Sequence, residues 1–518
     1  MPEALQDLRL HAARRPQAAA IVCGGQCVTY GALEALANRL AWVIRHSGLQ
    51  RGDHAVAVLG NRPELLALAW AAWRTGIYLT PLSTALAPPE LARLIEHCDA
   101  RLVLADGALP ALTCDLPQRV TPQAGPLRWL MLGGSADGFD PLEPLLTAAS
   151  ASPAEHEPPG ALMMTTSGTT GAPKGVIRPL LPPDWRGTPP FAADLIALFG
   201  VGGEDVRYLS TAPLYHAAPL RFALAVTAGG GCVHVMERFD ARDALALLQR
   251  EGITHSQWVP AMFQRLLALP DADRAAFSAP AHRVAIHGAA PCPVAVKRAM
   301  IDWWGPILLE YYSGSEGVGL TMLDAHEALA HPGSVGRARK GRLHVVDEAG
   351  RDLPPGSTGL VCFSGIAPFA YHRAPEKTAA RTLAGGLQTF GDIGHVDAEG
   401  WLYLTDRLDD MIISGGVNLY PQEIEAAIAE VSGVWECAVA GLPDERFGER
   451  PAAFVVPHRA HDPQAVLDAV RRHCGQVLGR YKQPAAFHLL QELPRTPTGK
   501  LLRRQLRQAL PSEPESPA

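Results

Sequence analysis

Hydrophobic and polar positions follow two periods along the first part of the chain. Short apolar runs at 18–22 and 54–59 are each followed by segments with an apolar residue every three or four positions, at 30–46 and 63–75. Runs of the first kind are typical of buried strands, and segments of the second kind are typical of amphipathic helices. This rhythm predicts a layered α/β structure built on parallel sheet.

The same rhythm continues as far as residue 105. Two prolines and Glu90 open a predicted helix at 88–97, and an apolar strand is predicted at 101–105. The stretch 121–159 is rich in Gly, Pro, Ala and Ser, so it is predicted to be a loose surface connection.

The pattern changes after Gly333. Short strands broken by turn residues are predicted at 342–347, 359–364 and 401–405, which favours a smaller β-rich subdomain. The last part of the chain predicts an α+β piece with elements at 421–431, 436–440, 463–474 and 486–490. We therefore predict an α/β fold with a large N-terminal domain of layered α/β subdomains plus a β-rich subdomain at 1–408, and a small α+β C-terminal domain at 409–518.

Composition narrows the function classes. The 518 residues are 47% hydrophobic and 19% charged with a formal net charge of -6, which is typical of a folded globular protein and argues against a nucleic-acid partner. The N-terminus lacks the apolar core of a signal peptide, and no apolar run is long enough to span a bilayer. A cytoplasmic location is expected. The nine cysteines show no metal-binding spacing.

The strongest candidate site follows an apolar strand predicted at 161–164. Residues 165–175 (Thr-Thr-Ser-Gly-Thr-Thr-Gly-Ala-Pro-Lys-Gly) gather five hydroxyls, three glycines and one lysine. Glycines let backbone N–H groups approach oxyanions, hydroxyls donate further hydrogen bonds, and Lys174 adds a positive charge. The spacing differs from Gly-x4-Gly-Lys-Ser/Thr, so this is not the P-loop of common nucleotide hydrolases. The run predicts a polyphosphate-binding loop.

Weaker signals come from three other places. Residues 310–317 (Glu-Tyr-Tyr-Ser-Gly-Ser-Glu-Gly) combine an aromatic ring, which can stack on a base, with a carboxylate, which can carry a metal. The small residues of 287–292 suit a base lying against backbone, or equally a tight turn. Asp392 and Arg407 can bind a sugar diol, although a turn carboxylate and a surface ion pair would explain them as well.

Together these segments resemble the signature of the adenylate-forming superfamily, which includes acyl-CoA synthetases, adenylation domains of peptide synthetases and luciferases. The resemblance spans nearly the whole chain, from Pro16 to Arg503. It implies that the glycine-rich loop binds the β- and γ-phosphates of ATP through Thr165, Thr166, Ser167, Gly168, Thr169, Thr170, Gly171 and Lys174.

The resemblance also implies the other nucleotide contacts. Glu316 is expected to bind Mg²⁺ together with the phosphates. Many relatives carry Tyr-Gly-x-Thr-Glu here, and Ser313 and Ser315 in this chain keep the hydroxyl and the carboxylate in place. The remaining expected contacts are the adenine neighbours Gly288, Ala289, Ala290 and Tyr312, the α-phosphate donor Ser315, and the ribose ligands Asp392 and Arg407.

Residues toward the C-terminus match family positions linked to domain motion. Asp409 matches the pivot of an interdomain hinge, so the C-terminal domain is expected to be mobile. Lys500, in the turn-rich run 493–500, matches the catalytic lysine that neutralises charge where two anions, the carboxylate and the α-phosphate, must meet. The expected coenzyme A passage is lined by Ser414, Gly415 and Gly416. A linker with a helix cap and a solvated lysine would explain the same residues without catalysis.

The acid-binding residues are the least specified. His216 matches a family position near the substrate carboxylate, although a core histidine fits as well. Trp258, Val259 and Met262 are candidates for an apolar acyl pocket, and core packing alone would also explain them. No cation stands out in these stretches to pair with a second substrate charge, so an apolar monocarboxylic acid is expected, whether fatty, aryl or cyclic.

The predicted activity is that of an ATP-dependent acyl-CoA synthetase, which forms an acyl-AMP and then a thioester with coenzyme A. ATP, Mg²⁺ and coenzyme A are the expected cofactors and co-substrates, and the catalytic candidates are Lys500, Glu316 and His216. An acyl-AMP ligase that loads a carrier protein in trans is the alternative. Joint retention of Glu316, Asp392, Arg407 and Lys500 disfavours a non-catalytic nucleotide-binding protein, while luciferase-type oxidation shares the adenylating residues.

Overall fold

The strand and helix rhythm of the sequence appears in the structure with closely matching bounds. The computed structural model describes residues 7–166, 174–414, 417–444, 446–495 and 501–508. The first predicted elements are β1 (Ala19–Cys23), α2 (Tyr30–His46), β3 (His54–Val58), α3 (Pro63–Trp73) and α4 (Pro88–His97). The described residues form two compact units, one containing those up to 332 with 367–380, and the other containing 333–366 with those after 380. The boundary at 408/409 stays a prediction.

A fully parallel sheet forms the first layer of unit 1, in the order β7-β6-β5-β3-β4-β8. Ala55 and Ala57 of β3 pack on one face of this sheet, and Val56 and Val58 pack on the other. Burial on both faces explains why the strand reads as a continuous apolar run. The other strands are β4 (Tyr78–Pro81), β5 (Ala100–Asp106), β6 (Arg128–Leu132), β7 (Asp140–Pro141) and β8 (Ala161–Leu162).

The prediction of a loose connection at 121–159 is wrong for its central part. Strand β6 pairs in parallel with β5, and Leu130, Met131 and Leu132 are buried. A helix, α7 (Leu142–Ala148), follows and contacts α2. The short apolar run of β6 is flanked by glycines and prolines, and that composition hid a core strand.

A second, longer sheet in unit 1 has the order β16-β15-β14-β13-β11-β12-β1-β2. Its inner strands are parallel, whereas β2 and β16 pair antiparallel. Its strands besides β1 are β2 (Gln26–Thr29), β11 (Arg207–Ser210), β12 (Cys232–Val235), β13 (His255–Trp258), β14 (Val284–His287), β15 (Leu308–Tyr312) and β16 (Leu320–Asp324).

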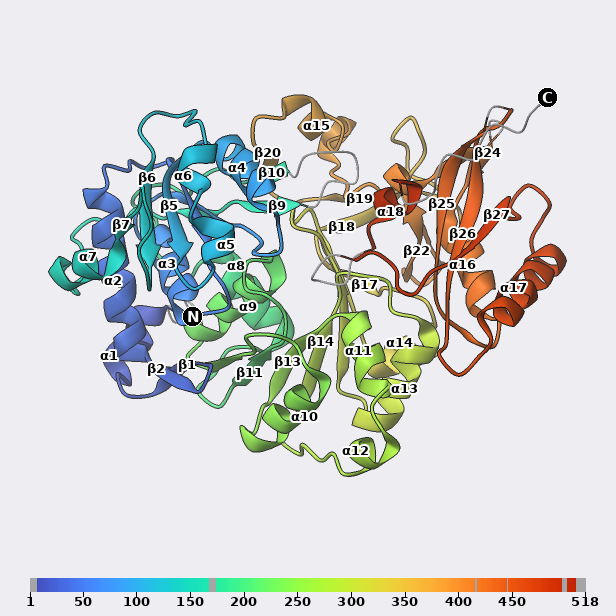
Figure 1. Cartoon of the computed structure of the whole chain (residues 1–518), viewed down its shortest axis with the longest axis horizontal. Coiled ribbons are helices and arrows are strands. Elements are labelled where there is room, and N and C mark those ends of the chain that lie inside the picture. The colour runs from blue at the N-terminus through green and yellow to red at the C-terminus, as the bar shows by residue number, and fades with distance from the viewer. Residues whose placement is uncertain (1–6, 167–173, 415–416, 445, 496–500, 509–518) are drawn as a thin grey trace. The chain divides into compact units, whose positions relative to one another are not determined.

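Helices cover both sheets (Figure 1). Helices α2, α3 and α9 (Ala217–Ala228) share one core with residues from both sheets, so they form the layer between them. The opposite face of the second sheet packs against α10 (Ala241–Arg250), α11 (Pro260–Leu267) and α13 (Val294–Trp304). Other helices of unit 1 are α1 (Leu8–Arg14), α5 (Pro110–Thr113), α6 (Leu116–Arg119), α8 (Pro190–Phe199), α12 (Asp271–Ala275), α14 (Ala325–Ala330) and α15 (Pro375–Ala379).

A small antiparallel sheet completes unit 1. It joins β9 (Met164–Thr166), β10 (Lys174–Ile177) and β20 (Ala370–Tyr371). Strand β20 belongs to a segment that we call the strap (residues 367–380), which returns to unit 1 from a distant part of the sequence. This sheet therefore places the strap beside β10, the strand that begins at Lys174.

Unit 2 contains two sheets. The first has the order β18-β19-β21-β22 and matches the predicted β-rich subdomain, with strands β18 (Arg342–Val346), β19 (Gly359–Ser364), β21 (Asp392–Val396) and β22 (Leu402–Arg407). The second has the order β24-β23-β26-β25, with β27 paired to β26. Its elements are β23 (Ile412–Ser414), β24 (Val417–Leu419), α16 (Pro421–Ala429), β25 (Val434–Asp444), β26 (Gly448–Pro457), α17 (Pro463–Val477), β27 (Ala486–Leu489) and α18 (Arg503–Gln508). Unit 2 also contains β17 (Arg337–Lys340) and the short 3-10 helices η1 (Ala384–Gly386) and η2 (Leu408–Asp410).

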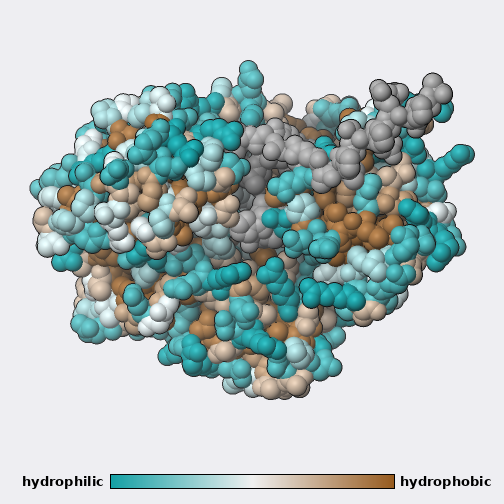
Figure 2. Space-filling view, in the orientation of Figure 1, coloured by the Kyte–Doolittle hydropathy of each residue, from teal (hydrophilic) through white to brown (hydrophobic). Residues whose placement is uncertain are grey.

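The visible surface is mostly hydrophilic, with smaller hydrophobic patches between the polar residues (Figure 2). Within the described part of the chain, no helix combines the length and the apolar character that crossing a bilayer requires.

Candidate active site

The two ends of the glycine-rich loop are held together by strand pairing. Lys174 pairs with Thr166 and Gly175 with Thr165 across β9 and β10. A Cβ on Gly175 would lie 2.7 Å from the Met163 sulfur, so a side chain at this position would require Met163 to move. The predicted phosphate ligands Ser167, Gly168, Thr169, Thr170 and Gly171 lie outside the described residues.

Glu316 lies in a tight turn after β15, and two side chains hold that turn, one directly after β10 and one from the strap. The turn closes with Gly317 N–H donating to the Gly314 carbonyl at 3.0 Å, and Gly317 has a φ of +64°. The Tyr371 hydroxyl donates to Glu316 Oε1 at 2.7 Å. Arg178 Nη2 donates to the Glu316 and Gly317 carbonyls at 2.9 and 2.8 Å, while its Nη1 donates to the Ala367 carbonyl of the strap.

Lys174 and Glu316, which come from separate motifs, are joined through Tyr371. The Lys174 Nζ lies 5.0 Å from the centroid of the Tyr371 ring, within the range of a cation–π interaction. The lysine predicted to bind phosphate and the predicted metal ligand therefore face one aromatic side chain in unit 1.

The predicted adenine wall is tightly packed at the end of β14. A Cβ on Gly288 would lie 2.7 Å from the Tyr311 carbonyl oxygen and 3.0 Å from its ring, so glycine is required there. Ala289 has a φ of +70°, a left-handed conformation that is uncommon outside glycine and clusters at functional sites. Ala290 follows directly, and Tyr312 ends β15 in register with Thr321 of β16. These residues lie at the carboxyl ends of neighbouring parallel strands, where open α/β sheets bind ligands.

His216 is the N-cap residue of α9, beside the carboxyl end of β11. Its Nε2 is buried and has no hydrogen-bond partner among the described residues. Burial lowers the pKa of His216 to about 4, so the imidazole is neutral at pH 7. Asn61 fixes the preceding loop by accepting from Leu214 N–H at 2.7 Å. A neutral ring with an unpartnered nitrogen can donate to, or accept from, a bound substrate.

The three predicted acyl-pocket residues lie in the hydrophobic core between the second sheet and its outer helices. Trp258 is 1% exposed and its ring lies 5.3 Å from that of Trp304, and Val259 and Met262 belong to the same cluster. Core packing therefore accounts for these side chains, and their contact with an acyl chain stays a prediction.

The two predicted ribose ligands come together in unit 2. Asp392 and Arg407 are register partners across β21 and β22, and Arg407 Nε lies 3.1 Å from Asp392 Oδ1. Asp392 is only 4% exposed, while the Arg407 side chain is 42% exposed. A buried carboxylate beside a more exposed guanidinium offers an acceptor and a donor at one edge of the sheet.

The predicted hinge residue Asp409 lies in η2, directly after β22, and Ser414 ends β23. Gly415, Gly416 and Lys500 lie outside the described residues. The chain just after Lys500 is anchored, since Arg503 forms ion pairs with Asp410 at 3.0 Å and with Glu425 at 2.7 Å. This anchor ties the start of α18 to the predicted hinge.

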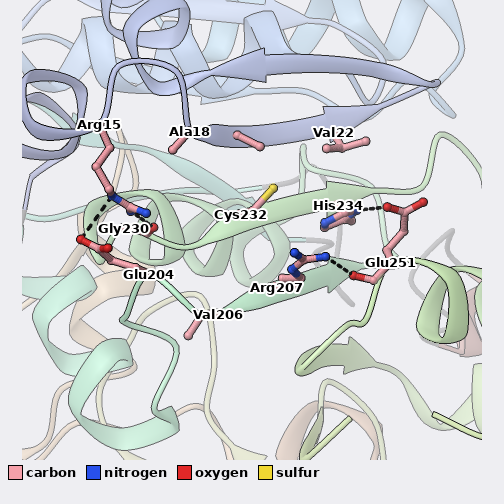
Figure 3. A pocket seen from close by; sticks show the side chains of 11 residues that line it. Arg15, Ala18, Val22, Glu204, Val206, Arg207, Gly230, Cys232, His234 and Glu251 are labelled. Atoms are coloured by element: carbon pink, nitrogen blue, oxygen red, sulfur yellow. Dashed lines mark hydrogen bonds and ion pairs between the residues drawn. The ribbon is translucent and has the colours of Figure 1, made fainter. Parts of the chain in front are cut away.

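A cavity of about 280 Å³ lies in the second sheet of unit 1, toward the amino ends of its parallel strands (Figure 3). Its lining comes mainly from β1, β11, β12 and the residues just before them. Its charged side chains pair with one another, as Arg15 does with Glu204 at 3.2 Å. The predicted nucleotide contacts Gly288 and Tyr312 lie at the carboxyl ends of their strands. This cavity is therefore distinct from the candidate active site.

Known proteins share this architecture along almost the whole chain. The profile of the AMP-binding enzyme family matches residues 8–370, and that of the AMP-binding enzyme C-terminal domain matches 423–500. The chain belongs to the AMP-binding enzyme family.

Relatives of this AMP-binding enzyme include the long-chain-fatty-acid–CoA ligase FadD13 of Mycobacterium tuberculosis (strain ATCC 25618 / H37Rv), 33% identical over 93% of both chains. The fatty acid–[acyl-carrier-protein] ligase ScoC of Streptomyces coeruleorubidus is 31% identical over 97% of this chain and 95% of its own. The solved structure of the ATP-bound RpMatB-BxBclM chimera B1 is similar with a TM-score of 0.82 and 28% identity, over 97% of this chain and 99% of that one. These matches confirm the predicted family, the fold class and the assignment as an AMP-forming acid–thiol ligase.

Three side chains of this AMP-binding enzyme were missed by the sequence reasoning. Tyr371 and Arg178 fix the Glu316 turn, and Arg221 of α9 points a partly buried guanidinium at Ser315, with Nη2 3.4 Å from its carbonyl. Burial lowers the pKa of Arg221 to about 10, with Arg178 lowering it further and Glu316 raising it. Arg221 follows His216 by five residues, but that spacing alone gave no sign of a partner at residue 315.

Proposed function

We propose that this enzyme is an acyl-CoA synthetase that activates an apolar monocarboxylic acid with ATP and Mg²⁺ and transfers the acyl group to coenzyme A. The observation that carries the proposal is the joining of Lys174 and Glu316, from two separate motifs, on the Tyr371 side chain. The fatty acids named for FadD13 and ScoC make fatty acids the first class to test, with aryl and cyclic acids next.

The residues present fit a magnesium ion that arrives with a nucleotide. Mg²⁺ is usually held by one or two carboxylates together with substrate phosphates and water. Among the described residues, no group of three or more His, Cys, Asp or Glu side chains is arranged to hold a metal. Glu316 provides one carboxylate, and its Oε2 has no protein hydrogen-bond partner in the described part of the chain. Bound there, the ion would supply positive charge to the departing pyrophosphate.

Adenylation requires the acid's carboxylate to attack the α-phosphorus, which joins two anions. Lys500 is proposed to neutralise the charge where they meet, with Ser315 donating to the α-phosphate. Lys174 and the hydroxyls of the glycine-rich loop are proposed to hold the β- and γ-phosphates. Asp392 and Arg407 are proposed to hold the ribose hydroxyls, and Tyr312 the adenine ring.

Thioester formation replaces AMP with a thiol. A carboxylate resists thiol attack because oxide is a poor leaving group, and AMP is a better one. We propose that the C-terminal domain turns about Asp409 between the two half-reactions, withdrawing Lys500 and presenting Ser414, Gly415 and Gly416 to the pantetheine arm. His216, as a neutral imidazole, is proposed to contact the substrate carboxylate.

The activity test is incubation with ATP, Mg²⁺, coenzyme A and a panel of fatty, aryl and cyclic acids, with AMP and acyl-CoA measured by mass. We expect acyl-CoA and AMP in equal amounts with at least one apolar acid. Acyl-AMP without acyl-CoA would instead favour loading of a carrier protein in trans, the reaction named for ScoC. Failure with every acid would contradict the proposed substrate class.

The half-reactions can be separated with Lys500→Ala. Pyrophosphate exchange should fall by about 100-fold or more, because removing one preorganised charge-stabilising group is worth roughly 3 kcal/mol. Thiolysis of supplied acyl-AMP should be retained. Equal loss of both half-reactions would refute the division of labour.

A further inference from the structure

We propose that Tyr371 is a positioning residue that holds the Glu316 carboxylate and the Lys174 ammonium in the arrangement that a magnesium–nucleotide complex needs. The inference rests on the roles proposed above for Glu316 and Lys174. It adds a side chain of the strap, which the sequence motifs do not include, to the phosphate and metal site.

The hydroxyl of Tyr371 fixes the carboxylate. It donates to Glu316 Oε1 at 2.7 Å, and Tyr371 is only 6% exposed, so water competes little for this hydrogen bond. A donor on Oε1 sets the plane of the carboxylate and leaves Oε2 for a metal. Outer partners of this kind orient metal ligands, and their loss typically reduces metal affinity by 10-fold to 100-fold.

The ring of Tyr371 holds the lysine. Lys174 begins β10 directly after the glycine-rich loop, and its Nζ lies 5.0 Å from the ring centroid. A lysine has a flexible four-carbon stem, so an aromatic face that attracts the ammonium narrows the positions that the charge occupies. One side chain therefore restrains a cation through its face and an anion through its hydroxyl.

The backbone around Tyr371 makes this placement rigid. Tyr371 pairs with Val176 across β20 and β10, and its N–H donates to Thr378 Oγ1 at 2.9 Å. The next residue, His372, donates its N–H to the Gly175 carbonyl at 2.7 Å. Arg178 adds a separate link, because it binds the carbonyls of both Ala367 and Glu316. The strap is thus tied to β10 and to the Glu316 turn by independent contacts.

The test separates the hydroxyl from the ring. Binding of α,β-methylene-ATP, which cannot be adenylated onto an acid, is measured by calorimetry with Mg²⁺ and with EDTA. Tyr371→Phe keeps the ring and loses the hydroxyl, so the gain in affinity on adding Mg²⁺ should fall by about 10-fold while affinity in EDTA is unchanged. Tyr371→Leu should also weaken binding in EDTA. In a Lys174→Ala background, Tyr371→Phe and Tyr371→Leu should bind equally in EDTA.

A matched control uses Tyr30, which is not part of the strap. Its buried hydroxyl donates to the Gly231 carbonyl at 2.6 Å. Tyr30→Phe loses the same chemical group and should keep the full magnesium gain, which separates positioning from a general loss of stability. A full magnesium gain in Tyr371→Phe would overturn the proposal. If Glu316→Gln also keeps the full gain, the metal role of Glu316 is wrong as well. If Glu316→Gln loses it, only the role of Tyr371 fails.

Discussion

Replacement of Arg503 should destabilise unit 2 far more than loss of an ordinary surface ion pair. Its guanidinium bridges Asp410, beside the predicted hinge, and Glu425 of α16, and its Nε donates to the Val439 carbonyl at 3.1 Å. Arg503 is 13% exposed, and the two carboxylates are 11% and 18% exposed. Although burial alone would lower the pKa of Arg503, Glu425 and Asp410 raise it above its usual value.

The magnitude follows from leaving two carboxylates without their cation. Arg503→Met keeps much of the aliphatic volume and removes the charge. Breaking a buried ion pair from one side costs about 3–5 kcal/mol. A unit of this size loses about 2–4 °C of melting temperature for each kcal/mol, so a decrease of roughly 10 °C is expected. The control Arg471→Met removes a half-exposed partner of Asp468, at 3.6 Å, and should cost at most about 1 kcal/mol.

Urea unfolding and calorimetric melting of the whole enzyme provide the measurement. Adding Asp410→Asn and Glu425→Gln to Arg503→Met should recover part of the loss, because those changes remove the unpaired charges. The reasoning is refuted if the Arg503→Met and Arg471→Met variants have the same melting temperature. It is also refuted if neutralising the two carboxylates recovers nothing, since the loss would then come from packing.

Two further predictions concern charged groups near the site. Burial raises the pKa of Asp406 from 3.8 to about 6. The folded state then holds that proton more tightly than the unfolded state, so stability is lost as the pH rises. From pH 4 to pH 7 the wild type should lose about 2 kcal/mol of unfolding free energy relative to Asp406→Asn in urea titrations; parallel curves would contradict this. Arg221→Met should reduce kcat/KM for pyrophosphate exchange by 10-fold to 100-fold, about 1.4–3 kcal/mol, because a partly buried cation beside Ser315 is lost. Arg221→Lys should retain more activity, and equal activity of both variants would exclude a role for the charge.

Helices and strands with a regular hydrophobic period were predictable from the sequence. A strand whose apolar run lies among glycines and prolines was not. Helices α2 and α4 have the predicted bounds, since each combines an apolar stripe with a recognisable start signal. Strand β6 was missed because its short apolar run lies among turn-forming residues, and its burial depends on pairing with β5. The role of Trp258 was equally hard to predict from sequence, since a large apolar side chain at the end of a strand suits a pocket and a core equally well.

The sequence by itself determined the chemistry that this protein carries. The hydroxyl- and glycine-rich run before Lys174, and the separate motifs with Glu316, Asp392 and Lys500, predicted an adenylate-forming enzyme because together they resemble the signature of that superfamily, in which each is expected to bind one part of a nucleotide. The tertiary structure decided which side chains hold those groups in place. Tyr371 and Arg178 reach Glu316, and Arg503 reaches Asp410, only after folding. A positioning contact joins residues far apart in sequence and depends on strand register and burial, whereas a phosphate-binding loop is local and shows directly in its residues.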